Sequence, residues 1–221
     1  MKWKDIFLEK AVPFSGEERY LNQLWVPVKE ETPKRLPRSD PSYFKTIGFK
    51  LGAESVDLHN QRKIQDKIRA ALKQLTFREE HVIVQFWSPH VVGMHQVLTT
   101  KDQPCGFGVT EEHLYLFRKD SEQNLYVVGN IYEDGDISPP TRVFKRGLPE
   151  WTSDLTNYSP QQYPQQDLAI SYKLHGYLAL PVFDSTIGLC VGVIEVLGSK
   201  KYMSFAYEVQ QIHEALKVSF K

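Results

Sequence analysis

The sequence predicts an α+β fold, in which an antiparallel sheet packs with amphipathic N- and C-terminal helices on one face. The strongest observation is a pair of apolar runs, residues 177–183 and 189–197, rich in β-branched residues and joined by a short polar turn. Such a pair is typical of an antiparallel hairpin. The second observation is an amphipathic pattern at each end of the domain, over residues 58–76 and from about residue 204 onward. The predicted order of elements is a helix, two strands, further helices, two strands and a last helix. An antiparallel sheet with the first and last helices packed together on one face is consistent with this order.

The first half of the domain begins with a helix over residues 58–76. Its apolar side chains recur at spacings of four, four and three, which places them on one face: Ile64, Ile68, Leu72 and Leu75. Residues 81–87 predict a strand that ends at Ser88-Pro89, and residues 96–100 predict its hairpin partner. Residues 111–120 then predict a second helix.

The second half begins with a short helix. Two prolines follow Ser138 and fit the first turn of a helix, which would end at Gly147. Trp151 lies in a strand-like edge, residues 153–167 form a polar loop, and a short apolar segment at 168–170 leads into the hairpin. The last helix has an apolar stripe made of Phe205, Val209, Ile212, Leu216 and Phe220.

Residues 1–57 are expected to be an extended or partly disordered arm, and residues 58–221 the folded domain. The arm contains a dense mixture of charge and proline at residues 29–41. Proline removes backbone donors and restricts φ, so this stretch favours a loop or linker.

The composition narrows the classes of function. The chain has 27 basic and 27 acidic residues, whereas a nucleic-acid-binding domain usually has a strongly basic face. No apolar span reaches about 18 residues, and the charged N-terminus does not resemble a signal peptide. We therefore expect an intracellular protein that binds neither membrane nor, by this chain, nucleic acid.

The sequence contains no evident catalytic or metal-binding motif. The seven histidines show no tight ligand spacing with a carboxylate or thiolate, and neither a nucleophile elbow nor a phosphate loop is present. Cys105 is expected in a surface loop and Cys190 as a small core residue. We therefore expect no catalytic residues, no metal and no cofactor.

Glu195 is unusual because it interrupts an apolar strand. A buried carboxylate is costly unless it is paired. Two interpretations remain open: Glu195 faces solvent at a sheet edge, which is the favoured one, or it pairs with a basic group such as Arg142 or His175. Gly192, in the same strand, would allow the close approach of a ligand or backbone.

Five sequence blocks occur in a characteristic order: Val-Ile-Val-Gln-Phe-Trp-Ser-Pro (82–89), Val-Leu-Thr-Thr-Lys-Asp-Gln-Pro (97–104), Arg-Val-Phe (142–144), Leu-Pro-Glu-Trp-Thr (148–152) and Leu-Ala-Leu-Pro-Val-Phe (178–183). With these blocks, the chain from about residue 60 to residue 219 resembles the amino-terminal domain of the plant NIN-like proteins, the RWP-RK transcription factors of nitrate signalling and nodulation.

The resemblance implies a GAF-like fold and a non-catalytic, signal-sensing regulatory role in nitrate or nodulation-type signalling. It also implies a location in the nucleus or cytoplasm and full-length NIN-like proteins as partners. No Arg-Trp-Pro-x-Arg-Lys string occurs, so we expect a short form without the RWP-RK and PB1 segments.

Two alternatives remain. The first is a sensor that binds nitrate or another small anion near Trp151, Tyr172 and His175. The second is a redox enzyme of GAF fold that uses Cys105 or Cys190, which would require a lowered thiol pKa.

Overall fold

The computed structural model describes residues 26–27, 54–128, 138–184 and 188–219. Most of the expected arm, the acidic residues 130–137 and Phe220 lie outside this part of the chain. The helices are α3 (Glu54–Leu72), α4 (Glu112–Glu122), α5 (Pro139–Arg146), α6 (Gln166–Ser171) and α7 (Ala206–Ser219), with a 3-10 turn η2 (Leu155–Asn157).

One mixed but largely antiparallel sheet forms the centre of the domain. Its strands are β1 (Val26–Pro27), β2 (Val82–Val92), β3 (His95–Thr99), β4 (Cys105–Phe107), β5 (Tyr126–Val127), β6 (Glu150–Thr152), β7 (Gly176–Phe183) and β8 (Cys190–Gly198). The strand order is β1-β6-β7-β8-β2-β3-β5, with β4 paired to β2. Only β1 and β6, among the described pairs, run parallel. Strand β8 is therefore central, between β7 and β2.

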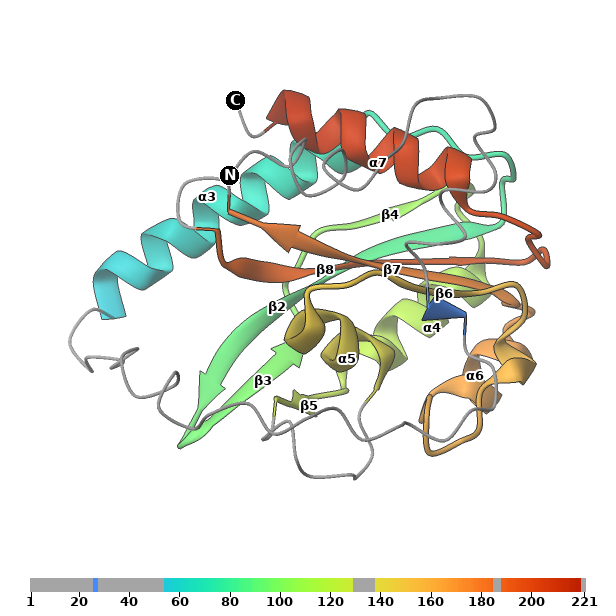
Figure 1. The fold of residues 1–221 in the computed structure, drawn as a ribbon, viewed down its shortest axis with the longest axis horizontal. Helices are drawn as coiled ribbons and strands as arrows, with labels where there is room; N and C mark the ends of the chain where they lie inside the picture. Colours follow the sequence, from blue (N-terminus) through green and yellow to red (C-terminus); the bar gives the residue numbers. More distant parts are fainter. Residues whose placement is uncertain (1–25, 28–53, 129–137, 185–187, 220–221) are drawn as a thin grey trace.

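The sheet separates two hydrophobic layers (Figure 1). Helices α3 and α7 pack side by side on one face, as predicted for the N- and C-terminal helices. Helices α4, α5 and α6 cover the opposite face, where they join the second core cluster. The predicted α+β class is confirmed.

Side-chain alternation along the central strands divides residues between these layers. In β2, Phe86 packs towards α3 and α7, whereas its neighbour Trp87 packs towards α4. In β8, Ile194 and Val193 are divided in the same way. Both faces of the sheet are covered, which explains why these strands are apolar nearly throughout.

The boundaries predicted for the short helix α5 are confirmed. It begins at Pro139 and ends at Gly147, whose φ of 63° is left-handed and suits glycine. Glycine is also required at position 192, because a Cβ there would lie 2.3 Å from Cζ of Phe86 and 2.5 Å from the Trp87 carbonyl oxygen. The predicted close approach at Gly192 is thus made by strand β2.

Two local expectations were wrong. Cys105 lies in the short strand β4, half-buried against the α4 layer, rather than in a surface loop. Strand β2 continues through Pro89 to Val92. Beyond Trp87 this strand no longer pairs with β8. Among the described strands, none pairs with that edge of β2 at Pro89, so proline is tolerated there.

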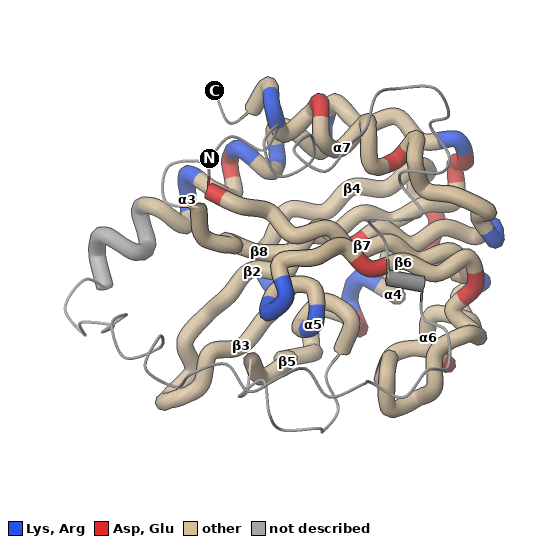
Figure 2. The backbone as a smooth tube through the Cα atoms, viewed as in Figure 1, with Lys and Arg blue, Asp and Glu red and all other residues tan. Residues whose placement is uncertain are grey.

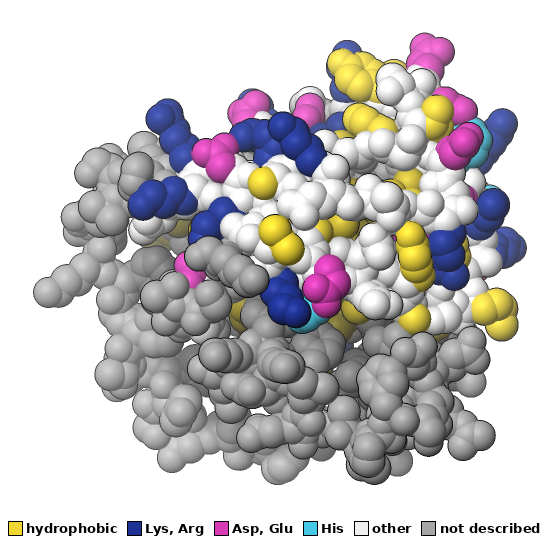
Figure 3. Space-filling model, turned by 90° about the horizontal axis from the view of Figure 1, so that it is seen from above, with side chains coloured by type: hydrophobic (Ala, Val, Ile, Leu, Met, Phe, Trp, Pro, Cys, Tyr) yellow, Lys and Arg dark blue, Asp and Glu magenta, His cyan; other side chains and the backbone are white. Residues whose placement is uncertain are grey.

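Charge is distributed over the described surface without a dominant sign. Basic and acidic residues are scattered along the backbone (Figure 2), and both kinds occur over the α3 and α7 face (Figure 3). None of the described helices has the length and apolar character needed to cross a membrane.

Candidate functional site

A row of polar side chains crosses the sheet on the face covered by α4, α5 and α6. The register places Gln85 of β2 opposite Glu195 of β8, Glu195 opposite Ala179 of β7, and Ala179 opposite Glu150 of β6. Two carboxyl groups therefore lie two strands apart, about 10 Å, on either side of a small residue. Each carboxyl group has its own set of hydrogen-bond donors.

Glu195 is completely buried and hydrogen-bonded to two neighbouring side chains. Its Oε2 accepts from Gln85 Nε2 at 2.6 Å and from Trp87 Nε1 at 2.7 Å. Its Oε1 has no hydrogen-bond partner. The expectation of a solvent-facing Glu195 was therefore wrong, because β8 is a central strand, and its partners are neither Arg142 nor His175.

Burial raises the pKa of Glu195 above its usual value, although the hydrogen bonds of Gln85 and Trp87 and the charge of Arg118 act to lower it. Arg118 of α4 reaches the network through Gln85, because its Nη1 donates to Gln85 Oε1 at 3.2 Å. The guanidinium is also held by the backbone carbonyl oxygens of Thr100 and Gln103. Helix α4 thus places a buried positive charge next to the Gln85–Glu195 pair.

A cluster of tyrosines lies between the two carboxyl groups. The rings of Tyr158, Tyr163 and Tyr177 lie 5.4–5.9 Å apart between centroids. The hydroxyl groups of Tyr163 and Tyr177 are buried and make no hydrogen bond. Both pKa values are raised, first by burial and then by the charge of Glu195. The phenols therefore remain neutral potential donors beside Glu195.

Tyr126 and Gln165 add to this buried layer. The Tyr126 ring lies 4.8 Å from the Trp87 ring, and its hydroxyl donates to Gln165 Oε1 at 3.0 Å. The Gln165 Nε2 atom is buried and has no partner. Buried polar atoms are nearly always hydrogen-bonded in folded proteins, so the unpartnered atoms of Tyr163, Tyr177, Gln165 and Glu195 make this layer the candidate site.

The second carboxyl group is fully paired. Glu150 accepts two hydrogen bonds from Arg142, one of them from Nε at 2.9 Å, and one from the Tyr158 hydroxyl at 2.8 Å. Arg142 also donates to the Gln162 carbonyl oxygen at 2.8 Å. This pair fixes α5 to β6 and leaves Glu195 as the partly satisfied member of the row.

The three sequence-predicted ligand residues lie in different surroundings. Trp151 packs on the α7 face, against the Phe205 ring. Tyr172 packs on the opposite face, and its hydroxyl donates to Asp120 Oδ2 at 3.0 Å. The structure therefore does not bring Trp151 and Tyr172 together.

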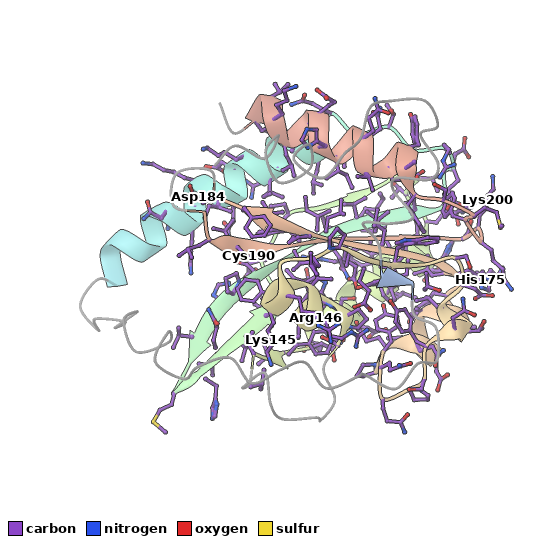
Figure 4. All side chains as sticks on the ribbon, in the orientation of Figure 1. Lys145, Arg146, His175, Asp184, Cys190 and Lys200 are labelled. Carbon is purple, nitrogen blue, oxygen red and sulfur yellow. The ribbon has the colours of Figure 1, made fainter. Side chains whose placement is uncertain are left out.

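His175 lies at the beginning of β7, at the end of the sheet near Lys200 (Figure 4). Its Nδ1 is 3.7 Å from Asp154 Oδ1, and Asp154 also pairs with Lys201. Burial acts to raise the pKa of Asp154, but hydrogen bonds from Lys201 and Thr156 lower it below its usual value. His175 thus belongs to a charged cluster at the end of the sheet.

Neither cysteine lies in an environment that favours a thiolate. Burial raises the pKa of Cys105 and of Cys190 to about 11 in each case. Cys190 also lies at the opposite end of the hairpin from His175 (Figure 4). Because the thiolate is the nucleophile, the geometry gives no support to cysteine redox catalysis.

The tyrosine cluster was not found from the sequence. Tyr163 falls in a segment that reads as a polar loop, and Tyr177 begins an apolar strand. Their convergence depends on the β7–β8 register and on the docking of α6 against η2. Within the part of the chain that the structure describes, a further group with potential ligand chemistry is formed by His81, Glu111 and His113.

The described elements form an α+β domain, in which helices cover both faces of a largely antiparallel sheet. A solved structure described as that of the GAF domain matches with a TM-score of 0.40 and 11% identity, over 62% of this chain and 62% of the other. A mutated NreA protein, altered in its nitrate binding site, from Staphylococcus aureus matches with a TM-score of 0.40 and 14% identity, over 65% of this chain and 87% of the other.

The chain is homologous to the plant NLP (NIN-like) proteins over about two thirds of its length. Protein NLP3 of Oryza sativa subsp. japonica is 36% identical over 140 residues, which cover 63% of this chain and 15% of the relative. The chain matches only 15–20% of the length of the plant NLP proteins compared. No family model matches it.

Proposed function

We propose that the chain is a non-catalytic, signal-sensing regulatory domain of the NIN-like type, which binds a small polar ligand at the tyrosine cluster. Homology to the NLP proteins supports the regulatory class. The observation that carries the binding site is the group of buried, unpartnered polar atoms around Glu195. Transcriptional regulation together with other NLP proteins, in the nucleus or cytoplasm, is the cellular part of this proposal.

Nitrate is the ligand we favour, because its chemistry suits the unpartnered donors. Nitrate is a planar anion whose three oxygens only accept hydrogen bonds. The hydroxyls of Tyr163 and Tyr177 and the Nε2 group of Gln165 can each donate to one oxygen. The aromatic surroundings exclude water, which strengthens such hydrogen bonds.

Glu195 determines how this binding depends on pH. An ionised carboxylate would repel an anion in the same buried layer, whereas a protonated carboxyl group would donate a further hydrogen bond. Burial raises the pKa of Glu195, which favours the protonated carboxyl group over the carboxylate. Nitrate binding should therefore take up a proton and be tighter at lower pH.

Calorimetric titration with sodium nitrate at about pH 5.5 and about pH 7.5 tests the proposal. The expected result is saturable binding of the wild-type protein that is tighter at the lower pH. Tyr177→Phe removes one unpartnered hydroxyl and should weaken binding, whereas Tyr115→Phe changes an exposed ring on α4 and should not. Sodium chloride at equal ionic strength is the control for non-specific anion effects.

Flat nitrate heats at both pH values would overturn nitrate as the ligand. If His175→Ala abolished binding while Tyr177→Phe did not, the anion would instead lie in the charged cluster with Asp154 and Lys201, and the site proposed here would be wrong.

A further inference from the structure

His81, Glu111 and His113 form a compact group at the edge of the domain, away from the tyrosine cluster. Their potential ligand atoms, one from each residue, all lie within 4.8 Å of one another. Glu111 Oε2 is 3.1 Å from His81 Nδ1 and 3.1 Å from His113 Nδ1. The two imidazole rings are stacked, with centroids 6.1 Å apart and planes inclined by 25°. Two histidine nitrogens and one carboxylate oxygen thus lie close enough together to share one ion.

We propose that His81, Glu111 and His113 bind a divalent transition-metal ion of the Zn²⁺ class. Zn²⁺ binds histidine nitrogen and carboxylate oxygen at about 2.0–2.2 Å, in a tetrahedral arrangement. Ligand atoms in such a tetrahedron are about 3.4 Å apart, close to both nitrogen–oxygen separations observed here. Small side-chain rotations that move the two nitrogens onto one ion would complete three of the four positions.

The elements next to the three residues fix the positions of their backbones. His81 immediately precedes the central strand β2, and its carbonyl oxygen accepts a hydrogen bond from Ser199 N at 3.0 Å. Glu111 is the residue before α4, where its side chain makes no helix-capping hydrogen bond, and His113 lies in the first turn. His81 and Glu111 therefore lie directly next to a regular strand and a regular helix, and His113 lies within that helix.

The side chains are also accessible to an ion from solvent. Their relative exposures are 44% for His81, 35% for Glu111 and 28% for His113. Three protein ligands leave one position for water or a further ligand, as in open zinc sites. The positive end of the α4 dipole opposes a cation here, but the Glu111 carboxylate lies directly between the imidazoles and compensates for it.

A bound ion would fasten the beginning of α4 to the beginning of β2. Helix α4 also supplies Arg118, whose guanidinium contacts Gln85, and Ser121, whose Oγ accepts from Gln85 Nε2 at 3.3 Å. The metal would consequently stabilise the helix that supports the Glu195 network. Metal binding itself does not depend on whether nitrate is the ligand of the tyrosine cluster.

The alternative interpretation is that Glu111 simply accepts hydrogen bonds from two imidazole N–H groups. Both arrangements have the same short separations, so metal affinity is the property that distinguishes them. A hydrogen-bonded trio predicts no specific metal binding, because each imidazole then keeps its Nδ1 proton.

The experiment is a Zn²⁺ titration of the purified, chelator-treated chain by calorimetry, at a pH above the usual imidazole pKa of about 6.5. Binding of Co²⁺, followed by its visible absorption, reports coordination geometry in parallel. We expect one ion per chain, an increase in the thermal unfolding midpoint on adding Zn²⁺, and tetrahedral Co²⁺ absorption bands.

Variants identify the ligands. His113→Ala and His81→Ala should each weaken Zn²⁺ binding by at least about tenfold, since a direct ligand matters at least as much as an outer-shell partner. His95→Ala, which removes an exposed histidine from β3, is the matched control and should bind as the wild type does. Circular dichroism without metal confirms that each variant is folded.

Equal affinity in His113→Ala, His81→Ala and the wild-type protein would overturn the proposal, as would the absence of saturable binding by the wild type. A failure to bind nitrate would leave these results unchanged, so the two proposals can be refuted separately.

Discussion

Replacing Glu195 by the isosteric glutamine should change how the free energy of unfolding depends on pH. The amide oxygen of Glu195→Gln can still accept from Gln85 Nε2 and Trp87 Nε1, the two donors that now contact Oε2. The substitution removes the ionisable group with little change of shape. Its effect on stability therefore reports the balance between burial and hydrogen bonding at this position.

The magnitude follows from two opposing contributions. A hydrogen bond to a charged group contributes about 1.5–3 kcal/mol, so the two donors stabilise ionised Glu195 by about 3–6 kcal/mol. Removing a carboxylate from water costs several kcal/mol even after relaxation. Burial is the larger effect here, because the pKa of Glu195 is raised.

The sign of the pH dependence follows from this raised pKa. The folded state holds the Glu195 proton more tightly than the unfolded state, so the stabilising effect is complete below the unfolded-state pKa of about 4.3. It is lost as pH rises through the folded-state pKa. Each unit of difference between the folded-state and unfolded-state pKa values changes the free energy of unfolding by about 1.4 kcal/mol.

Urea unfolding at a series of pH values, from below the usual glutamate pKa to about pH 8, measures the effect. The difference in free energy between Glu195→Gln and the wild type should increase with pH in favour of the variant, and then level off. Glu214→Gln, which alters an exposed side chain on α7, controls for the loss of one negative charge. A difference that stays constant over the whole range would refute the argument that burial outweighs the hydrogen bonds.

Three further substitutions or modifications test other parts of the structure. Gly192→Ala should lower the free energy of unfolding by about 1–3 kcal/mol, because the Cβ of the introduced alanine would overlap strand β2. An unchanged midpoint of urea unfolding would contradict the β2–β8 packing. Arg142→Ala should cost about 3–5 kcal/mol, because it removes the positive charge that pairs with the buried Glu150 carboxylate. Restoration of stability by adding Glu150→Gln is the check on that cause. Alkylation of Cys105 and Cys190 should be about 100-fold slower in the folded than in the urea-unfolded chain, since burial raises both pKa values from 9.0 to about 11. Mass spectrometry at equal pH measures the alkylation rates of the two states. Similar rates in both states would show that the thiols are exposed.

Local patterns in the sequence determined the order of the elements and much of their extent. Proline at the start and glycine at the end placed helix α5 correctly, because these residues act through their own backbone geometry. The spacing of apolar residues identified the buried face of α3, where Ile68 is fully buried. The resemblance to NIN-like proteins also came from short local strings.

Only the tertiary structure decided the environment of Glu195. Its interpretation as a solvent-facing residue failed because strand order is not encoded in the pattern of one strand: β2 pairs with β8 across more than 100 intervening residues. That register places Gln85 and Trp87 beside the carboxyl group and buries it. Tertiary structure likewise decided that Trp151 and Tyr172 do not meet, because they lie on opposite faces of the sheet.

Long-range packing likewise brought together His81, Glu111 and His113. His81 precedes β2, whereas Glu111 and His113 lie at the start of α4, and no short sequence spacing relates all three. The sequence by itself thus determined the class of fold, the sequence of its elements and the family likeness. The tertiary structure alone decided which polar groups meet in its interior and at its edge, because those contacts depend on strand register and helix docking rather than on local propensity.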